Sequence, residues 1–86
     1  MELFLDTANV DEVAEGVRMG VVSGVTTNPS LASKEGIGNL NDYKQVVQEI
    51  CRLVDGPVSA EVLAAEVPGM LEEAREIVLW APNVVV

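Results

Sequence analysis

The sequence predicts an α/β fold in which parallel strands alternate with helices along the chain. Two observations support this prediction: short apolar stretches rich in β-branched residues are separated by segments of helical periodicity, and the links between them are short. Such β/α units form a parallel sheet with right-handed crossovers. The length of 86 residues allows one small domain, which we expect to span residues 1–86.

The first unit is predicted to be a strand over residues 3–6 and a helix over residues 10–19. The strand is a short apolar run. The helix begins after Asn9, which has Glu12 three residues later, in a variant of the capping box. Apolar residues then recur at helical spacing until Gly20, a helix-stop signal.

The second unit is predicted to be a β-branched strand over residues 21–26 and a short helical turn. Asn28 can cap this turn, and Pro29 suits its first position. A longer helix follows, with apolar residues at helical spacing over residues 43–54, and the segment 55–57 (Asp-Gly-Pro) ends it.

The last units are a third strand over residues 58–63 and a helix marked by apolar residues from Met70 to Ala81. A fourth strand is predicted at residues 84–86. A chain that stops at Val86 stops inside an apolar strand, without a turn or a polar tail. We therefore expect the natural sequence to continue beyond this residue.

Composition excludes several classes of protein. The chain has no histidine, which rules out a serine–histidine triad and any zinc site that contains histidine. Five scattered basic residues stand against fourteen acidic ones, so we expect no nucleic-acid partner. The single cysteine, Cys51, is expected in the core on the apolar face of the long helix. We expect no membrane segment and a cytoplasmic location.

Polar residues stand near the carboxyl end of each complete strand: Asp6, Thr26 and Glu61. Strands covered by helices are normally apolar, and alternate residues of a strand share a face. We expect these three side chains on one face, with Asn28 just beyond, at the end of the sheet where β/α barrels carry their active sites. The other face is apolar and suits packing against helices; its residues are Leu3, Leu5, Val25, Ala60 and Val62.

Each candidate also has a structural interpretation. Asp6 can bond backbone groups in a turn, and Asn28 can be no more than a helix cap. Thr26 is ordinary in a strand, whereas Glu61 is disfavoured there without a task. Sequence reasoning leaves both interpretations open.

Four ordered motifs closely resemble those of the small bacterial and archaeal type of transaldolase, in the transaldolase/fructose-6-phosphate aldolase family. They run from Phe4 to Asn9, from Gly24 to Leu31, from Gly56 to Val62 and from Ala81 to Val86. The resemblance covers essentially the whole chain. It implies the amino-terminal half of a (β/α)8 TIM barrel, with the first four of its eight strands.

The resemblance also implies an activity: transfer of a dihydroxyacetone unit between sugar phosphates through a lysine Schiff base, in the pentose phosphate pathway. It implies no cofactor or metal and a homo-oligomer. The lysine would directly follow Val86. Asp6 would be the general acid/base, Glu61 a proton shuttle that works through water, and Thr26 and Asn28 would hold the ketose. A glutamate at position 61 favours a transaldolase over its sister aldolases, which carry glutamine there.

The 86-residue chain alone is expected to be inactive, because Lys34 and Lys44 look like solvated surface charges without an activating pocket.

The sequence leaves three alternatives to a transaldolase open. The chain could be a non-catalytic module whose open sheet edges pair two half barrels. The intact protein could be a fructose-6-phosphate aldolase-like lyase. An aspartyl phosphatase that uses Asp6 is disfavoured, because Ala8 stands where a second acidic magnesium ligand is needed.

Overall fold

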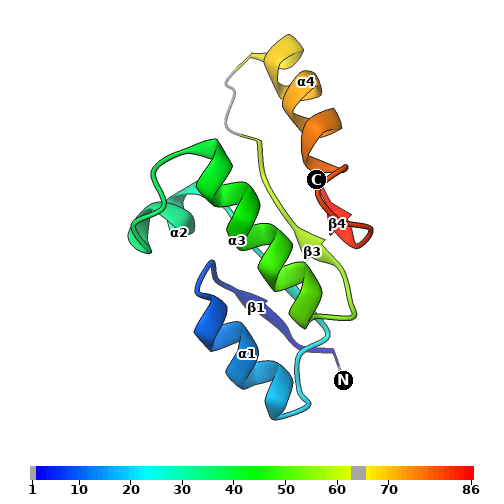
Figure 1. Ribbon diagram of the computed structural model, residues 1–86. Coiled ribbons are helices and arrows are strands. Elements are labelled where there is room, and N and C mark those ends of the chain that lie inside the picture. Colours follow the sequence, from blue (N-terminus) through cyan, green and yellow to red (C-terminus); the bar gives the residue numbers. More distant parts are fainter. Residues whose placement is uncertain (1, 63–65) are drawn as a thin grey trace.

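The computed structural model describes residues 2–62 and 66–86. The strands are β1 (Phe4–Asp6), β2 (Gly24–Thr26), β3 (Val58–Ser59) and β4 (Val84–Val85). The helices are α1 (Val10–Arg18), α2 (Pro29–Lys34), α3 (Leu40–Leu53) and α4 (Val67–Ile77). Strands and helices follow one another in the predicted order (Figure 1).

The four strands form one parallel sheet in the order β1-β2-β3-β4. Sequential neighbours joined by helices are the arrangement expected for the first four strands of a (β/α)8 barrel, so the predicted fold class is confirmed. In the described residues, no helix is both long enough and apolar enough to cross a membrane.

The helices α1, α2 and α3 begin at asparagine caps, whereas Glu66, the N-cap residue of α4, forms no side-chain cap hydrogen bond. The side-chain oxygens of Asn9 and Asn28 each accept a hydrogen bond from the backbone N–H three residues later, at 3.0 and 2.9 Å, as predicted for α1 and α2. The helix α3 is the longest, as predicted, but it begins at Leu40, because Asn39 caps it. Apolar periodicity missed this first turn because its residues are exposed.

The strands are shorter than predicted. Residues 21–23 precede the point where β1 and β2 begin to pair, Phe4 opposite Gly24, and Val21 is 46% exposed. The strand β3 ends at Ser59, and Leu63, at the end of its predicted range, lies outside the described residues. Pairing in a parallel sheet depends on the neighbouring strand, which apolar runs in the sequence do not report.

The helix α4 also differs from its predicted bounds. It begins earlier, at Val67, with a proline in its first turn, and it ends at Ile77 rather than near Ala81. After Ile77 the chain forms a tight turn, in which the Trp80 N–H donates to the carbonyl three residues earlier, that of Ile77, at 3.0 Å. This turn buries the Trp80 ring edge-on against Tyr43, with the ring centroids 5.8 Å apart.

The core lies between one face of the sheet and the helices α1 and α3, which lie side by side over it (Figure 1). Val25 and Ala60, predicted to face the helices, are buried, and Leu5 is half-buried against them. Leu3 differs from that prediction, because it is 43% exposed at the start of the sheet. Alternate residues of each strand point to the opposite face of the sheet, which we call the open face. Its residues are Phe4, Asp6, Thr26, Ser59 and Val85.

Candidate functional site

Asp6 and Thr26 end the first two strands and lie directly opposite each other in the sheet. The Thr26 hydroxyl donates a hydrogen bond to Asp6 Oδ1 at 2.8 Å. A hydrogen bond to a carboxylate is roughly twice as strong as a neutral one, so it fixes the orientation of the acid. The structure thus brings two of the predicted site residues into contact at the carboxyl end of the open face.

Glu61 lies at the same end of the sheet, two residues beyond Ser59, which pairs with Thr26. Its side chain is exposed. Neighbouring strands are about 4.8 Å apart and a strand rises about 3.3 Å per residue, so two strand intervals and a two-residue offset place Glu61 about 12 Å from Asp6, with β2 between them. The two carboxylates do not touch, and a small molecule lying across the three strands could reach both.

Asn28 follows β2 at this end and caps α2 through its Oδ1 atom, as its structural interpretation predicted. The amide Nδ2 of the same side chain has no hydrogen-bond partner in the described part of the chain. An asparagine side chain carries separate acceptor and donor groups, so it can cap a helix and still donate to a ligand. The cap and the predicted ligand role are therefore compatible.

Sequence reasoning treated Tyr43 only as an apolar-face residue of the long helix. In the structure its ring is 3% exposed, and its hydroxyl reaches the ends of β2 and β3. The hydroxyl accepts the Glu61 backbone N–H at 3.3 Å and lies 2.9 Å from Thr27 Oγ1. The signal was available: a buried tyrosine hydroxyl needs a polar partner, and Thr27 is a polar residue directly after a strand.

The Tyr43 hydroxyl keeps its proton. Burial raises the pKa of the phenol above its usual range, and the negative charge of Glu61 raises this pKa further. Hydrogen bonds with Thr27 and with the Glu61 backbone oppose this rise. Tyr43 therefore acts as a neutral hydrogen-bonding group beneath the carboxyl ends of β2 and β3.

The cysteine and the two lysines of the chain lie on helices rather than on the strands that carry Asp6 and Thr26. Cys51 is 8% exposed in the core, as predicted; burial raises the pKa of its thiol to about 11, although the neighbouring Arg52 opposes this. Lys34 is exposed in the last turn of α2, which agrees with a surface charge. Lys44, on α3, is half-buried and thus less exposed than predicted.

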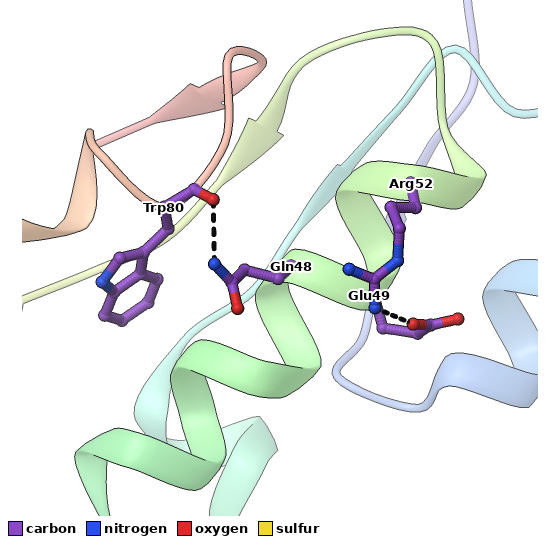
Figure 2. Close-up of polar contacts among 4 residues, drawn as sticks. All are labelled: Gln48, Glu49, Arg52 and Trp80. Atoms are coloured by element: carbon purple, nitrogen blue, oxygen red, sulfur yellow. Dashed lines mark hydrogen bonds and ion pairs between the residues drawn. The ribbon is translucent and has the colours of Figure 1, made fainter.

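The helix layer has polar contacts of its own (Figure 2). The Gln48 amide donates to the Trp80 carbonyl at 3.0 Å and links α3 to the chain after α4. Arg52 forms an ion pair with Glu49 one turn earlier on the surface of α3. This arginine therefore belongs to the helix layer and not to the open face that carries Asp6.

Two hollows of the described surface are lined by residues outside the candidate site. One lies along α4, beside Gly69, Glu72 and Leu79, and a larger one borders α3, beside Gln45 and Val46. Both belong to the helix layer. The candidate site residues instead lie at the carboxyl ends of the first three strands, and the described helices do not cover the open face there.

Comparisons with known proteins point to one family. The family model described as "Transaldolase/Fructose-6-phosphate aldolase" matches residues 3–86. A protein named probable transaldolase from Dehalococcoides mccartyi is 60% identical over 87 residues, which cover 100% of this chain and 39% of that protein. Proteins of the same name from Desulforudis audaxviator and Methanococcus maripaludis are 59% and 57% identical, over 100% of this chain and 38% of each relative. The chain thus spans less than two fifths of the length of these relatives.

Proposed function

Because the chain belongs to the transaldolase/fructose-6-phosphate aldolase family, we propose that residues 1–86 supply the first four β/α units of a transaldolase barrel in the product of the complete reading frame. This whole gene product transfers a dihydroxyacetone unit between sugar phosphates through a lysine Schiff base. It works in the cytoplasm as a homo-oligomer, in the pentose phosphate pathway. The observation that carries the proposal is the hydrogen-bonded pair of Asp6 and Thr26 on the open face.

The strand register suits the position that this proposal gives to the lysine, directly after Val86. Ser59 pairs with Val85, so the next residue on the same face of β4 would lie opposite Glu61. Adjacent strands place such neighbours about 5 Å apart. An amine at that position would face the same opening as the two carboxylates, as Schiff-base chemistry requires of a nucleophile and its proton-transfer groups.

Asp6 is the general acid/base in this mechanism. Its Oδ1 is held by Thr26, so the second carboxylate oxygen can take the proton from the sugar hydroxyl next to the bond that breaks. The electrons of the broken carbon–carbon bond move toward the Schiff base, and the aldose phosphate leaves. The same carboxyl returns a proton when the acceptor aldose adds.

Glu61 handles protons at the Schiff base itself. Formation and hydrolysis of the imine move protons between the amine, the carbonyl oxygen and water, and a carboxylate near the amine can transfer them through one water molecule. Asn28 donates from Nδ2 to the ketose end, while Thr26 orients Asp6 beside it. The sugar phosphate thus spans the ends of the first strands.

Borohydride trapping tests the proposal. The whole gene product is incubated with fructose 6-phosphate and borohydride, and intact mass with peptide mapping should locate a reduced adduct on the lysine after Val86. The 86-residue chain, treated in parallel, should gain no adduct. An adduct on Lys34 or Lys44 would overturn the assignment. Transfer to an aldose phosphate acceptor, measured against simple release of the aldehyde, separates a transaldolase from an aldolase-like lyase.

A second candidate function is a non-catalytic half-barrel module, favoured by apolar exposure on the open face. Phe4 on β1 and Val85 on β4 are 46% and 51% exposed, and these strands form the two edges of the described sheet. Two copies could cover these side chains by pairing their edges. Native mass spectrometry of the 86-residue chain should then show dimers at high concentration, and monomers alone would exclude this function.

A further inference from the structure

We propose that Tyr43 is a positioning residue that holds the main chain at Glu61 and thereby places the Glu61 carboxylate at the candidate site. The inference rests on the proposed function, because the placement of Glu61 affects a rate only if that carboxylate handles protons. The Tyr43 side chain is 3% exposed, beneath the carboxyl ends of β2 and β3, and it acts through its hydroxyl.

Three hydrogen bonds connect the ends of β2 and β3 through Tyr43. Thr27 Oγ1 donates to the Ser59 carbonyl at 2.9 Å, and this uses the only proton of that hydroxyl. The 2.9 Å contact between Thr27 Oγ1 and the Tyr43 hydroxyl must then have Tyr43 as donor. The tyrosine oxygen is left to accept the Glu61 N–H, at 3.3 Å. The chain of bonds therefore has one direction, and every hydroxyl proton in it is used.

This connection acts just beyond the described residue pairs of β3. The Ala60 N–H still donates to the Val85 carbonyl at 2.8 Å, but Glu61 lies beyond the paired residues of β3. In the described part of the chain, its backbone N–H is bonded to the Tyr43 hydroxyl. A helix residue thus holds the main chain at the point where the Glu61 side chain leaves it.

Tyr43 is itself held rigidly. It belongs to the longest helix, and its ring meets Trp80 edge-on, with an angle of 78° between the ring planes. Thr27, its hydroxyl partner, is 2% exposed. Since buried side chains at native packing density have little room to move, the hydroxyl offers Glu61 a fixed point.

A double-mutant cycle in the whole gene product tests the inference. Tyr43→Phe removes the hydroxyl and keeps the ring, so kcat for transfer should fall about tenfold while KM stays within about twofold. In a Glu61→Gln background the same substitution should change kcat by less than about twofold, because the group that it positions is already lost. Hydrogen exchange at the Glu61 amide should become faster in Tyr43→Phe.

The matched control is Gln48→Leu, which removes a different side-chain hydrogen bond of the same helix, to the Trp80 carbonyl. Its kcat should stay within about twofold of the parent protein. Thr27→Val provides a second route to the same loss if Tyr43→Phe does not fold, and Thr27→Ser, which keeps the hydroxyl, should restore the rate. Equal kcat losses from Tyr43→Phe in both backgrounds of an active enzyme would overturn the inference alone. Absence of transfer by the parent protein would overturn the proposed function and the inference with it.

Discussion

Replacing Asn83 with aspartate should destabilise the chain strongly. Asn83 precedes β4, and its Nδ2 donates toward three backbone carbonyls at the end of α3 and the turn after it, those of Cys51, Val54 and Gly56, at 3.2, 3.0 and 3.0 Å. An amide nitrogen has two protons, so the three contacts amount to about two full hydrogen bonds. The side chain thus ties the start of β4 to the end of α3.

The Asn83→Asp variant is nearly isosteric but places an oxygen against these carbonyls. Two lost hydrogen bonds at about 1 kcal/mol each, with partly buried acceptors left unpaired, give a loss of about 2–4 kcal/mol. The total stability expected for 86 residues is about 4–13 kcal/mol, at 0.05–0.15 kcal/mol per residue. The loss is therefore a large fraction of the whole. Asn83→Ala loses the same hydrogen bonds without adding repulsion, so its cost should lie at the lower end of this range, at about 2 kcal/mol.

Urea unfolding of the 86-residue chain, followed by circular dichroism and by the fluorescence of its single tryptophan, measures these losses. The carbonyls disfavour the ionised form of the introduced carboxyl, so its pKa is raised in the folded state. Folding then binds a proton, and the deficit of Asn83→Asp shrinks as the pH falls through that raised pKa. A loss below about 0.5 kcal/mol at neutral pH, or the same loss at every pH, would refute the reasoning.

Three further predictions test the core and the site. Alkylation of Cys51 at pH 8 should be about a hundredfold slower in the folded chain than in urea, because its thiol pKa is raised to about 11 in the folded state. Stability should fall between about pH 9 and pH 11, because the thiol of the unfolded chain ionises first. Equal alkylation rates in the folded chain and in urea would contradict the raised pKa. Asp6→Asn should lower kcat of the whole gene product by about 100-fold or more without changing its unfolding midpoint, since Asp6 is exposed; an unchanged kcat would remove its catalytic role. Ile50→Ala should cost about 2–5 kcal/mol in urea unfolding, because Ile50 is fully buried, whereas Val21→Ala, at a 46% exposed site, should cost less than about 0.5 kcal/mol; similar losses at both positions would contradict the burial argument.

Local signals in the sequence were sufficient for the order of the elements and for two helix starts. Asn9 and Asn28 cap helices because a side-chain oxygen and a backbone N–H three residues later come together within one turn. The same kind of signal at Asn39 was missed, because the first turn of α3 is exposed and has no apolar periodicity. Strand ends were placed poorly, because the extent of β2 is set by where β1 begins to pair with it.

For the candidate site, too, the sequence predicted the positions of residues along the chain but not their contacts. The sequence placed Asp6, Thr26 and Glu61 near the ends of their strands, because alternation within a strand needs no information beyond the chain order. It did not reveal that Thr26 bonds Asp6, since this contact requires the register between two strands. It also did not reveal Tyr43 as a partner of Glu61, 18 residues away.

By itself, then, the sequence determined the alternation of strands and helices, the helix caps and the family to which the chain belongs. Those features depend on residues a few positions apart or on motifs that are contiguous in the chain. Only the tertiary structure decided which polar groups meet: Thr26 with Asp6 across two strands, and Tyr43 with Thr27 and the Glu61 backbone between a helix and the sheet. Hydrogen bonds act over about 3 Å, so partners distant in the sequence are identified only once packing has fixed the register of strands and helices.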